Sequence, residues 1–361
     1  MAGARPNFIK VAPLIRAIEK NGQARYSLVF AGRQDDPTLE DSLFSDLQMP
    51  RPDVCLDVDS TSLNEITAQV MGKLDAHLEQ NPTDVVIVVD DLASTMAAAI
   101  VAKKRGLKLA HLVAGTRSFN IQMPKEVNRL VIDALSDYLF TAGVKSNSIA
   151  TREQAETSQT YMVGNILMDT LRFNHQRLRK PALDIEEGKY LVFTLNRKVL
   201  LANEEKISQM IATITDKAGG LPIIAPLRGP AASLISKLRS CSAGLLPKGS
   251  ENPQFSNFKP VPPLPYLEFG WLTAHAKGII TDSGNVAEEA TFNNVPCITL
   301  NSYTEHQETV TIGTNVLVGE DPLRLGEEVS RMVSGQWKPG ALPDRWDGRT
   351  AERIVSIVME A

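Results

Sequence analysis

The segment HLVAGTRSFNIQMPKEVNRL, residues 111–130, has the outline of an acid/base site. Its pattern indicates the end of a buried strand, a polar loop and the start of a helix, and α/β proteins bind their ligands at the carboxyl ends of such strands. The position at the strand end is Val113, however, and the position at the helix start is Lys125. Neither side chain is a carboxylate. The polar side chains that remain in the segment are Arg117, Glu126, Asn128 and Arg129.

Asp90 and Asp91 form a second candidate, at the end of the apolar run 84–90. Two adjacent carboxylates can raise the pKa of one of them, which would make that group a usable base near neutral pH. The same pair could equally be a solvated strand end. The sequence leaves both interpretations open.

Composition places the chain among ordinary globular proteins. Its 361 residues are 43% hydrophobic and 22% charged, long enough for two domains of roughly 150–200 residues. The 38 basic and 42 acidic residues are evenly mixed, so no nucleic-acid partner is expected. Three cysteines without metal-ligand spacing fit a reducing cytoplasm. No apolar run approaches the ~20 residues of a membrane span and no secretory leader is present, so no membrane partner is expected and the predicted location is cytoplasmic.

Short apolar runs alternate with amphipathic stretches along the whole chain. The expected strands are 26–32, 84–90, 108–114, 138–142 and 160–164, followed by 189–195, 221–227, 276–282 and 295–301. The expected helices include 62–80, 94–106, 125–137, 203–218, 266–275 and 285–292. Buried strands separated by helices predict parallel sheets that are covered on both faces.

This pattern predicts an α/β fold of two Rossmann-like, doubly wound domains. The expected divisions are an N-terminal domain (1–170), a crossover (171–188), a C-terminal domain (189–345) and a final helix packing back across the interface (346–361). The Pro- and Ser-rich stretch 243–265 is expected to be an irregular loop. Doubly wound sheets bind ligands at the carboxyl ends of their strands, so a cleft between the domains is the expected site.

Seven segments, in their order and spacing, resemble the non-hydrolysing UDP-N-acetylglucosamine 2-epimerases. They are GARPNFIKVAPLI (3–15), DDLASTMAAAI (90–100), AHLVAGTRSF (110–119), MPKEVNRL (123–130), VGNILMDTL (163–171), TDSGNVAEEA (281–290) and GTNVLVG (313–319). The resemblance implies a glycosyltransferase-B architecture that binds a UDP-sugar, with no metal or other cofactor. It also implies inversion at C2 of the sugar: a base removes the C2 proton, UDP leaves, and UDP re-adds after protonation from the other face.

The nucleotide half of the family pattern is partly retained. By resemblance, the backbone N–H groups of Ser283 and Gly284 would hold a diphosphate at the positive end of a helix, and Glu289 would bind the ribose. Arg5 and Lys10 keep the spacing of cations that would face phosphate. Two departures weaken this half. Asn285 replaces a family glycine, and His306 replaces an arginine and lacks its bidentate fork.

The sugar half departs further from the family. Asp91 matches the family's Asp, although Asp90 replaces the glycine before it. The family's catalytic Glu in His-x-Glu-Ala-Gly-Leu-Arg is Val113, and the first Glu of its Pro-Glu-Glu-x-Asn-Arg is Lys125. The family's His in Thr-x-His-Arg is Asn196, and its Gly-Gln-His loop has Gln34 in the His place.

The joint pattern favours a catalytically degraded homologue, because the loss of one acid/base group alone typically lowers a rate about 10²–10⁴-fold. Such a pseudoenzyme would retain at most weak affinity for UDP or a UDP-sugar. It would act as a homodimer or in complex with an active paralogue. The alternative is an active UDP-GlcNAc 2-epimerase, interconverting UDP-GlcNAc and UDP-ManNAc, or a related UDP-sugar enzyme. Its rearranged acid/base set would be Asp91, Glu126, Lys125 and Asp90. A third possibility is a scaffold that binds no nucleotide.

The start of the chain raises a separate question. In the family a central strand precedes the Gly-x-Arg-Pro loop, whereas only Met1 and Ala2 stand before Gly3 here. An empty slot would leave unpaired backbone groups, each costing about 1–3 kcal/mol if dry. We therefore expect compensation by another segment, by closure of the neighbouring strands or by a strand from a partner chain. Upstream residues outside this numbering are the alternative.

Overall fold

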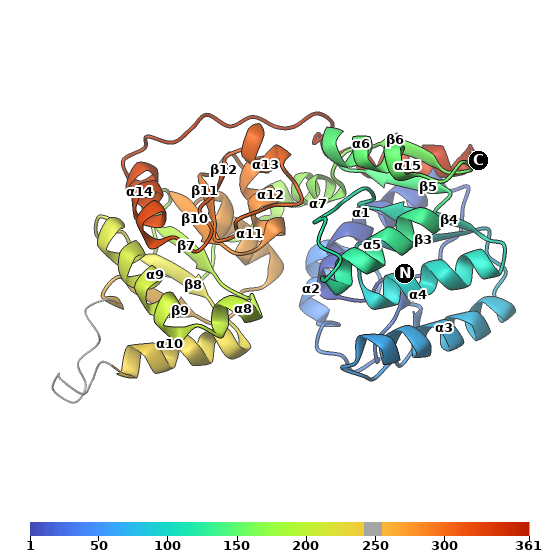
Figure 1. Ribbon diagram of the computed structural model, residues 1–361, viewed down its shortest axis with the longest axis horizontal. Coiled ribbons are helices and arrows are strands. Elements are labelled where there is room, and N and C mark those ends of the chain that lie inside the picture. Colours follow the sequence, from blue (N-terminus) through green and yellow to red (C-terminus); the bar gives the residue numbers. More distant parts are fainter. Residues whose placement is uncertain (242–254, 361) are drawn as a thin grey trace. The chain divides into compact units, whose positions relative to one another are not determined.

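The computed structural model describes residues 1–241 and 255–360. Two compact α/β units divide the chain (Figure 1). Unit 1 comprises Met1–His175 and Asp344–Ala361, and unit 2 comprises Gln176–Pro343. The chain thus leaves unit 1 within the segment 171–188 and returns to it near the C-terminus.

Unit 2 is built on a parallel sheet of six strands in the order β12-β11-β10-β7-β8-β9. The strands are β7 (Leu191–Thr194), β8 (Ile223–Pro226), β9 (Phe258–Val261), β10 (Gly278–Thr281), β11 (Cys297–Thr299) and β12 (Asn315–Leu317). The order reverses beside β7, the doubly wound arrangement that the alternating pattern predicts. The expectation of an irregular loop at 243–265 is wrong in part, because β9 lies within it. Pro260 is tolerated there because β9 is an edge strand. Residues 243–254 of that stretch lie outside the described residues.

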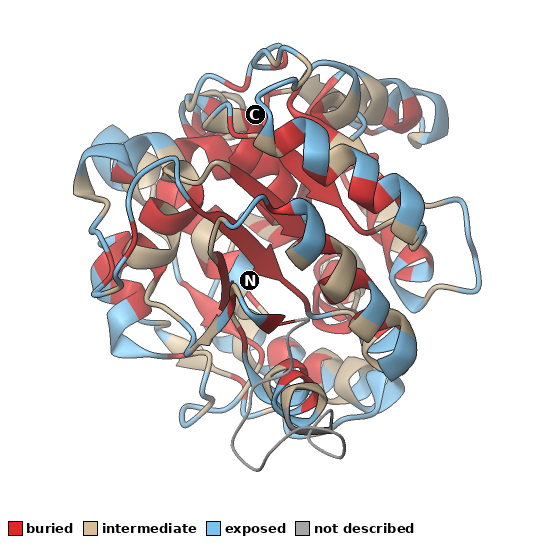
Figure 2. Cartoon of the chain, turned by 90° about the vertical axis from the view of Figure 1, so that its left-hand side faces the viewer, coloured by how far each residue is buried: buried red, intermediate tan, exposed pale blue. Residues whose placement is uncertain are grey.

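Helices cover this sheet, and their apolar faces form its core. They are α8 (Lys198–Leu201), α9 (Glu204–Lys217), α10 (Gly229–Cys241), α11 (Tyr266–Ala274), α12 (Gly284–Phe292), α13 (Glu308–Thr311) and α14 (Pro322–Val333). Figure 2 shows buried strands between helices that expose one side. Strand residues such as Phe193 and Ile280 pack in one cluster with helix residues such as Ile211 and Val329.

Unit 1 contains a four-stranded parallel sheet in the order β3-β4-β5-β6 and a separate two-stranded pair, β1-β2. The strands are β1 (Val29–Phe30), β2 (Val54–Cys55), β3 (Val85–Val89), β4 (Lys108–Leu112), β5 (Tyr138–Thr141) and β6 (Gln159–Met162). The helices are α1 (Arg5–Asn21), α2 (Asp41–Leu47), α3 (Leu63–Gln80), α4 (Ala93–Lys104), α5 (Pro124–Leu135), α6 (Val144–Glu153), α7 (Ile166–Asn174), the 3₁₀ turn η1 (His175–Arg177) and α15 (Thr350–Met359). In unit 1, α15 packs against α1 and α7.

Met1 and Ala2 join the two sheets of unit 1. The amide of Ala2 donates to the Val29 carbonyl at 2.8 Å, and its carbonyl accepts from Ala31 at 2.9 Å. The Met1 amine donates to the Ile87 carbonyl of β3 at 2.8 Å. None of the expected compensations is therefore observed. Met1 and Ala2 themselves occupy the strand position, and they hydrogen-bond to residues 29 and 31 on one side and to β3 on the other.

Helix α1 continues through Pro13, which has no N–H to donate to the carbonyl of Ile9. The hydroxyl of Thr170 in α7 donates to that carbonyl instead, at 2.6 Å. A neighbouring side chain thus satisfies the carbonyl that the proline leaves without its helical donor, and it fixes α1 to α7.

Among the described residues, no helix is both long enough and apolar enough to cross a membrane.

Candidate functional site

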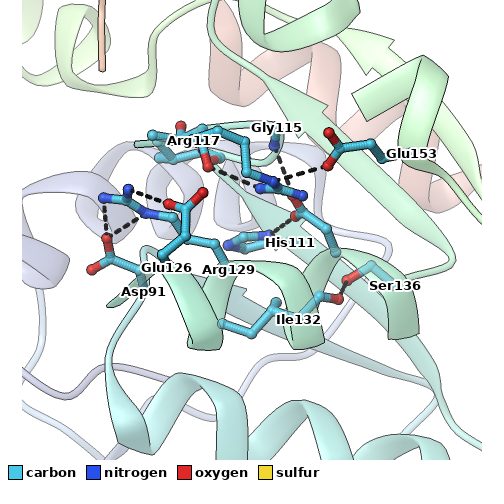
Figure 3. Close-up of polar contacts among 12 residues, drawn as sticks. Asp91, His111, Gly115, Arg117, Glu126, Arg129, Ile132, Ser136 and Glu153 are labelled. Atoms are coloured by element: carbon cyan, nitrogen blue, oxygen red, sulfur yellow. Dashed lines mark hydrogen bonds and ion pairs between the residues drawn. The ribbon is translucent and has the colours of Figure 1, made fainter. Parts of the chain in front are cut away.

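The polar residues of the segment 111–130 converge at the carboxyl ends of β3 and β4 (Figure 3). Asp90 and Asp91 follow β3, residues 113–123 form the loop after β4, and α5 carries Glu126, Asn128 and Arg129. Three linked clusters result, each built around one carboxylate.

Asp91 is held by α5. Its carboxylate contacts the Arg129 guanidinium at 2.6 Å and the Lys125 ammonium at 3.2 Å. Its carbonyl accepts from the side-chain amide of Asn128 at 2.8 Å. Burial alone would raise the pKa of Asp91, but Lys125 and Arg129 outweigh burial, and the net shift is downward. Asp91 is therefore a stably ionised group and a weak base near neutral pH.

Glu126 organises the loop before α5. Its carboxylate accepts from the Ser118 amide at 2.8 Å, from the Ser118 hydroxyl at 2.9 Å and from the Phe119 amide at 3.0 Å. Arg129 contacts the same carboxylate at 3.2 Å. Burial would raise the pKa of Glu126, but the hydrogen bonds from Ser118, Phe119 and Arg129 lower it overall. Since its oxygens serve the loop, Glu126 is also a weak base.

Asp133 is the centre of the third cluster. Its carboxylate contacts His111 Nδ1 at 2.6 Å, the Arg117 guanidinium at 2.7 Å and the Gly115 amide at 3.0 Å. Arg117 also reaches Glu153 of α6 at 2.9 Å. Its side chain is only 2% exposed, so Arg117 holds the loop between α5 and α6. Burial would raise the pKa of Asp133, but His111 and Arg117 lower it overall.

Asp90 is paired with α1. Its carboxylate contacts the Lys10 ammonium at 2.6 Å and accepts from the Asn7 side chain at 2.8 Å. Asp90 and Asp91 therefore face different cations, and the interpretation in which one of them has a raised pKa is wrong for Asp91. Arg5, expected to face phosphate, contacts Glu40 at 2.7 Å.

Val113, at the position of the family's catalytic Glu, has a left-handed backbone with φ = +69°. A β-branched residue there is strained by about 1–3 kcal/mol. Gly115, with φ = +72°, is required by packing, because an added Cβ would lie 2.1 Å from the Ser146 carbonyl oxygen of α6. Glycine thus suits the loop at position 115, whereas Val113 adopts its left-handed backbone at an energetic cost.

In unit 2, the ends of β7 and β10 are joined by Asp282. One carboxylate oxygen accepts from the amides of Asn196 and Arg197 at 2.7 and 2.6 Å. The other, Oδ1, is buried without a hydrogen-bond partner in the part of the chain that the structure describes. Burial raises the pKa of Asp282, although the two amide bonds partly oppose it. Asn196, which replaces the family's histidine, is therefore fixed through its backbone.

Helix α12 begins beside Asp282 with its first amides uncapped. Ser283 is the N-cap residue, but its side chain makes no capping hydrogen bond. Its amide donates to the Thr281 hydroxyl at 3.0 Å, and Gly284 is exposed. Of the two backbone amides expected to bind a diphosphate, the amide of Ser283 is thus already engaged. An uncapped helix start retains orphan N–H groups and partial positive charge, which suit an anion.

Glu289 lies one helical turn or more into α12 and is buried, and its carboxyl makes no hydrogen bond among the described residues. Burial, with a smaller contribution from Glu288, raises the pKa of Glu289 to about 8. His306 Nε2 lies 3.4 Å from Glu288.

Within the part of the chain that the structure describes, no three His, Cys, Asp or Glu side chains are placed to hold a metal ion.

Sequence reasoning missed Asp133, Glu153 and Asp282. A signal for Asp133 exists: it follows Glu126 and Arg129 at helical spacing, so all three share the inward face of α5. No signal linked Glu153 to Arg117, because 36 residues separate them. Asp282 lies within the segment 281–290, but its bonds to the loop after β7 depend on the pairing of β10 with β7, which the motif does not show.

The doubly wound sheet of unit 2 and the parallel sheets of unit 1, with polar groups gathered at their strand ends, indicate an α/β protein of the glycosyltransferase-B type. A family model described as UDP-N-acetylglucosamine 2-epimerase matches residues 16–359. The chain belongs to the UDP-N-acetylglucosamine 2-epimerase family.

Individual relatives agree with this assignment. The chain is 32% identical to the UDP-N-acetylglucosamine 2-epimerase of Methanocaldococcus jannaschii, over 99% of this chain and 97% of that protein. It is similar to a solved structure of the M. jannaschii UDP-GlcNAc 2-epimerase in complex with UDP-GlcNAc and UDP, with a TM-score of 0.81 at 30% identity. That match covers 100% of this chain and 98% of the other. A Rickettsia bellii structure, named UDP-N-acetylglucosamine 2-epimerase, has a TM-score of 0.85 at 22% identity, covers 99% and 95% of the two chains, and shows the fold alone.

Proposed function

We propose that this chain is a catalytically degraded epimerase homologue that binds UDP or a UDP-sugar weakly through unit 2. The M. jannaschii relative was solved with UDP-GlcNAc and UDP, which supports a nucleotide-sugar ligand for the family fold. The proposed setting is the cytoplasm, as a homodimer or beside an active paralogue. No metal or cofactor is part of the proposal.

The observation that carries the proposal is the state of the remaining carboxylates in unit 1. Asp91 and Glu126 both have lowered pKa values and are both bonded to Arg129. A general base works best with a pKa near the operating pH, so neither group is suited to removing a carbon-bound proton. Val113 and Asn196 cannot take that role either, because a hydrocarbon and a neutral amide do not accept protons at neutral pH.

The nucleotide affinity that we propose depends on α12. Its uncapped start would meet the diphosphate, and Glu289 lies deeper on the same helix, where the ribose would bind. A ribose hydroxyl would give Glu289 the hydrogen bond that it lacks among the described residues. This site is weakened by Asn285 and by the engagement of the Ser283 amide with Thr281.

A working epimerase with a rearranged set is the second candidate. Its favourable observation is that Lys125, 57% exposed, lies 3.2 Å from Asp91, so an ammonium and a carboxylate are side by side near solvent. Asp90 and Glu126 would complete the set. The lowered pKa of Asp91 counts against it, because the contact with Lys125 is part of what keeps Asp91 ionised.

Turnover of UDP-GlcNAc to UDP-ManNAc separates the two candidates. We expect no conversion, or a rate several orders of magnitude below the ~1–10 s⁻¹ common among enzymes. A rate within that range would refute the degraded assignment. The combined variant Val113→Glu, Lys125→Glu, Asn196→His tests whether the backbone still supports chemistry. A gain in rate would show that side chains alone were lost, and no gain would show that the backbone has also drifted.

Isothermal titration with UDP and UDP-GlcNAc tests the binding part. We expect dissociation constants weaker than about 10 μM and a further loss of about tenfold in Glu289→Ala, the loss of one to two hydrogen bonds. Glu327→Ala on the exposed face of α14 makes the same substitution away from the site and should leave binding unaltered. Equal affinity in the two variants would remove Glu289 from the site. Absence of any binding would favour the scaffold without nucleotide.

A further inference from the structure

A second polar groove lies entirely within unit 1, where the C-terminal half of α1 meets α7 and α15. Its volume is about 900 Å³, at the upper end of the range typical of small-molecule sites. It is distant in sequence from the segment 111–130 and from the start of α12, and it contains no residue of either. The groove therefore shares no lining residue with the nucleotide site proposed above.

The lining of this groove is predominantly basic. Its charged side chains are Arg16, Lys20, Arg172, Arg349, Asp169 and Glu352. Both oxygens of Asp169 accept from the first amides of α15, Ala351 at 2.8 Å and Thr350 at 3.1 Å. Glu352 contacts Lys20 at 3.2 Å across the surface. Both carboxylates of the lining thus have partners. The four basic side chains outnumber the two carboxylates, so the lining carries an excess of positive charge.

Two guanidinium groups of the groove are held in fixed orientations. Arg16 donates to the Leu47 carbonyl at 2.8 Å and stacks 3.8 Å from the centre of the Phe173 ring. Arg172 donates to the Asp347 carbonyl at 2.6 Å. These contacts order both side chains, so the side chains would lose less conformational entropy when a ligand binds them.

Gly348 allows the chain to pass close to Arg172. Its φ is +70°, and an added Cβ would lie 2.7 Å from Cδ and 3.0 Å from Cβ of Arg172. The segment before α15 can therefore approach Arg172 only because residue 348 has no side chain. The exposed Arg349 follows directly on the rim of the groove.

We propose that this groove binds a small phosphate-bearing anion. Planar guanidinium groups match phosphate oxygens two at a time, and Arg172 and Arg349 are both exposed to receive them. Phe173, 36% exposed in the same wall, offers an apolar surface beside the charges. The ligand class is accordingly a phosphate monoester or diphosphate with a small apolar or aromatic group, and the proposal stands whether or not unit 2 binds UDP.

The experiment uses the full chain carrying Gly284→Pro, so that binding at the proposed nucleotide site is weakened. The substitution removes a backbone amide at the start of α12, and proline suits the first position of a helix. Phenyl phosphate, pyrophosphate and inorganic phosphate are titrated by calorimetry, and protection of residues 344–360 is followed by hydrogen exchange. We expect saturable binding, tightest for phenyl phosphate, with protection in that segment. Arg172→Gln with Arg349→Gln should weaken it about tenfold or more, as expected for lost charge-assisted hydrogen bonds.

Arg25→Gln with Lys104→Gln is the matched control, since both side chains are exposed and outside the groove. It changes the net charge equally and should leave binding unaltered. Gly348→Ala displaces Arg172 without removing charge and should also weaken binding. Equal weakening by the control pair would reduce the effect to net charge and overturn the proposal. Absence of binding, or binding that the groove variants leave unchanged, would overturn it as well.

Discussion

The polar residues at the strand ends of unit 1 and those around α12 in unit 2 differ in how fully they satisfy one another. In unit 1, Asp91, Glu126 and Asp133 each have two or more cationic or amide partners, and all three have lowered pKa values. In unit 2, among the described residues, the Glu289 carboxyl has no hydrogen bond and Asp282 Oδ1 is buried without one. Both of these carboxyls have raised pKa values.

This difference is the one expected between a structural network and the binding surface that we propose in unit 2. A buried polar group that lacks a partner destabilises the fold, so its retention is consistent with a partner that arrives from outside. A network whose members satisfy one another offers a ligand little. The carboxylates of unit 1 therefore hold its own loop and helices. In unit 2, carboxyl oxygens remain that could still accept or donate a hydrogen bond.

Breaking the Asp133 cluster should have the largest effect. Asp133→Asn keeps the shape but removes the charge that His111 and Arg117 face, and breaking a buried ion pair typically costs about 3–5 kcal/mol. We expect a loss of that size in the free energy of unfolding of unit 1, measured by hydrogen exchange in denaturant. Glu153→Gln, at the 29% exposed end of the same cluster, should cost less than about 1 kcal/mol. Similar losses in both variants would contradict the central role of Asp133.

Glu289→Gln should change how stability depends on pH. The pKa of Glu289 is about 8 in the folded chain, against 4.5 for the free group, so the folded state holds a proton that the unfolded state has lost. Stability from this group is therefore full below pH 4.5 and is lost as pH rises through 8. We expect the variant to gain about 1–3 kcal/mol relative to the parent between pH 5 and pH 8.5. A parent and a variant with parallel pH profiles would show that Glu289 is ionised in the fold.

Relief of strain at Val113 should give a smaller gain in stability. Val113→Gly removes a β-branched side chain from φ = +69°, and this gain exceeds the extra entropy of glycine in the unfolded chain. We expect stabilisation by about 1 kcal/mol, measured by chemical denaturation. Val113→Ala should show a smaller gain, because alanine remains strained there. Destabilisation by glycine would mean that packing of the valine outweighs its backbone strain.

Lys125→Gln should have the smallest effect. Lys125 is 57% exposed, and such surface pairs contribute about 0–1 kcal/mol. We expect a loss below about 0.5 kcal/mol that disappears in high salt. Arg129→Gln, buried between Asp91 and Glu126, should cost several times more. If the lysine variant were as damaging as the arginine variant, the unit 1 network would extend to its surface.

Much of the architecture follows from the sequence alone, because apolar runs of strand length between amphipathic stretches have one economical solution, parallel sheets under helices. Strand β3 and helix α12 are predicted within a residue or two of their observed bounds for this reason. Strand β9 was missed, because its prolines and polar neighbours resemble a loop until a sheet edge is available to accept them. Residue type alone also shows that neither Val113 nor Asn196 can act as a proton acceptor at neutral pH, whatever the fold.

Tertiary structure alone decided which retained residues are still available. Arg117 and Lys10 have the residue types of ligand-binding cations, but Arg117 is buried against Asp133 and Glu153, and Lys10 against Asp90. These partners are 16 to 80 residues away, and pairing over such separations depends on strand order and helix packing. The same holds for the start of α12, since a motif shows that a helix begins but not whether its amides are capped. Residue type is set by the sequence, whereas the charge, burial and partners that give a residue its chemistry are properties of the folded chain.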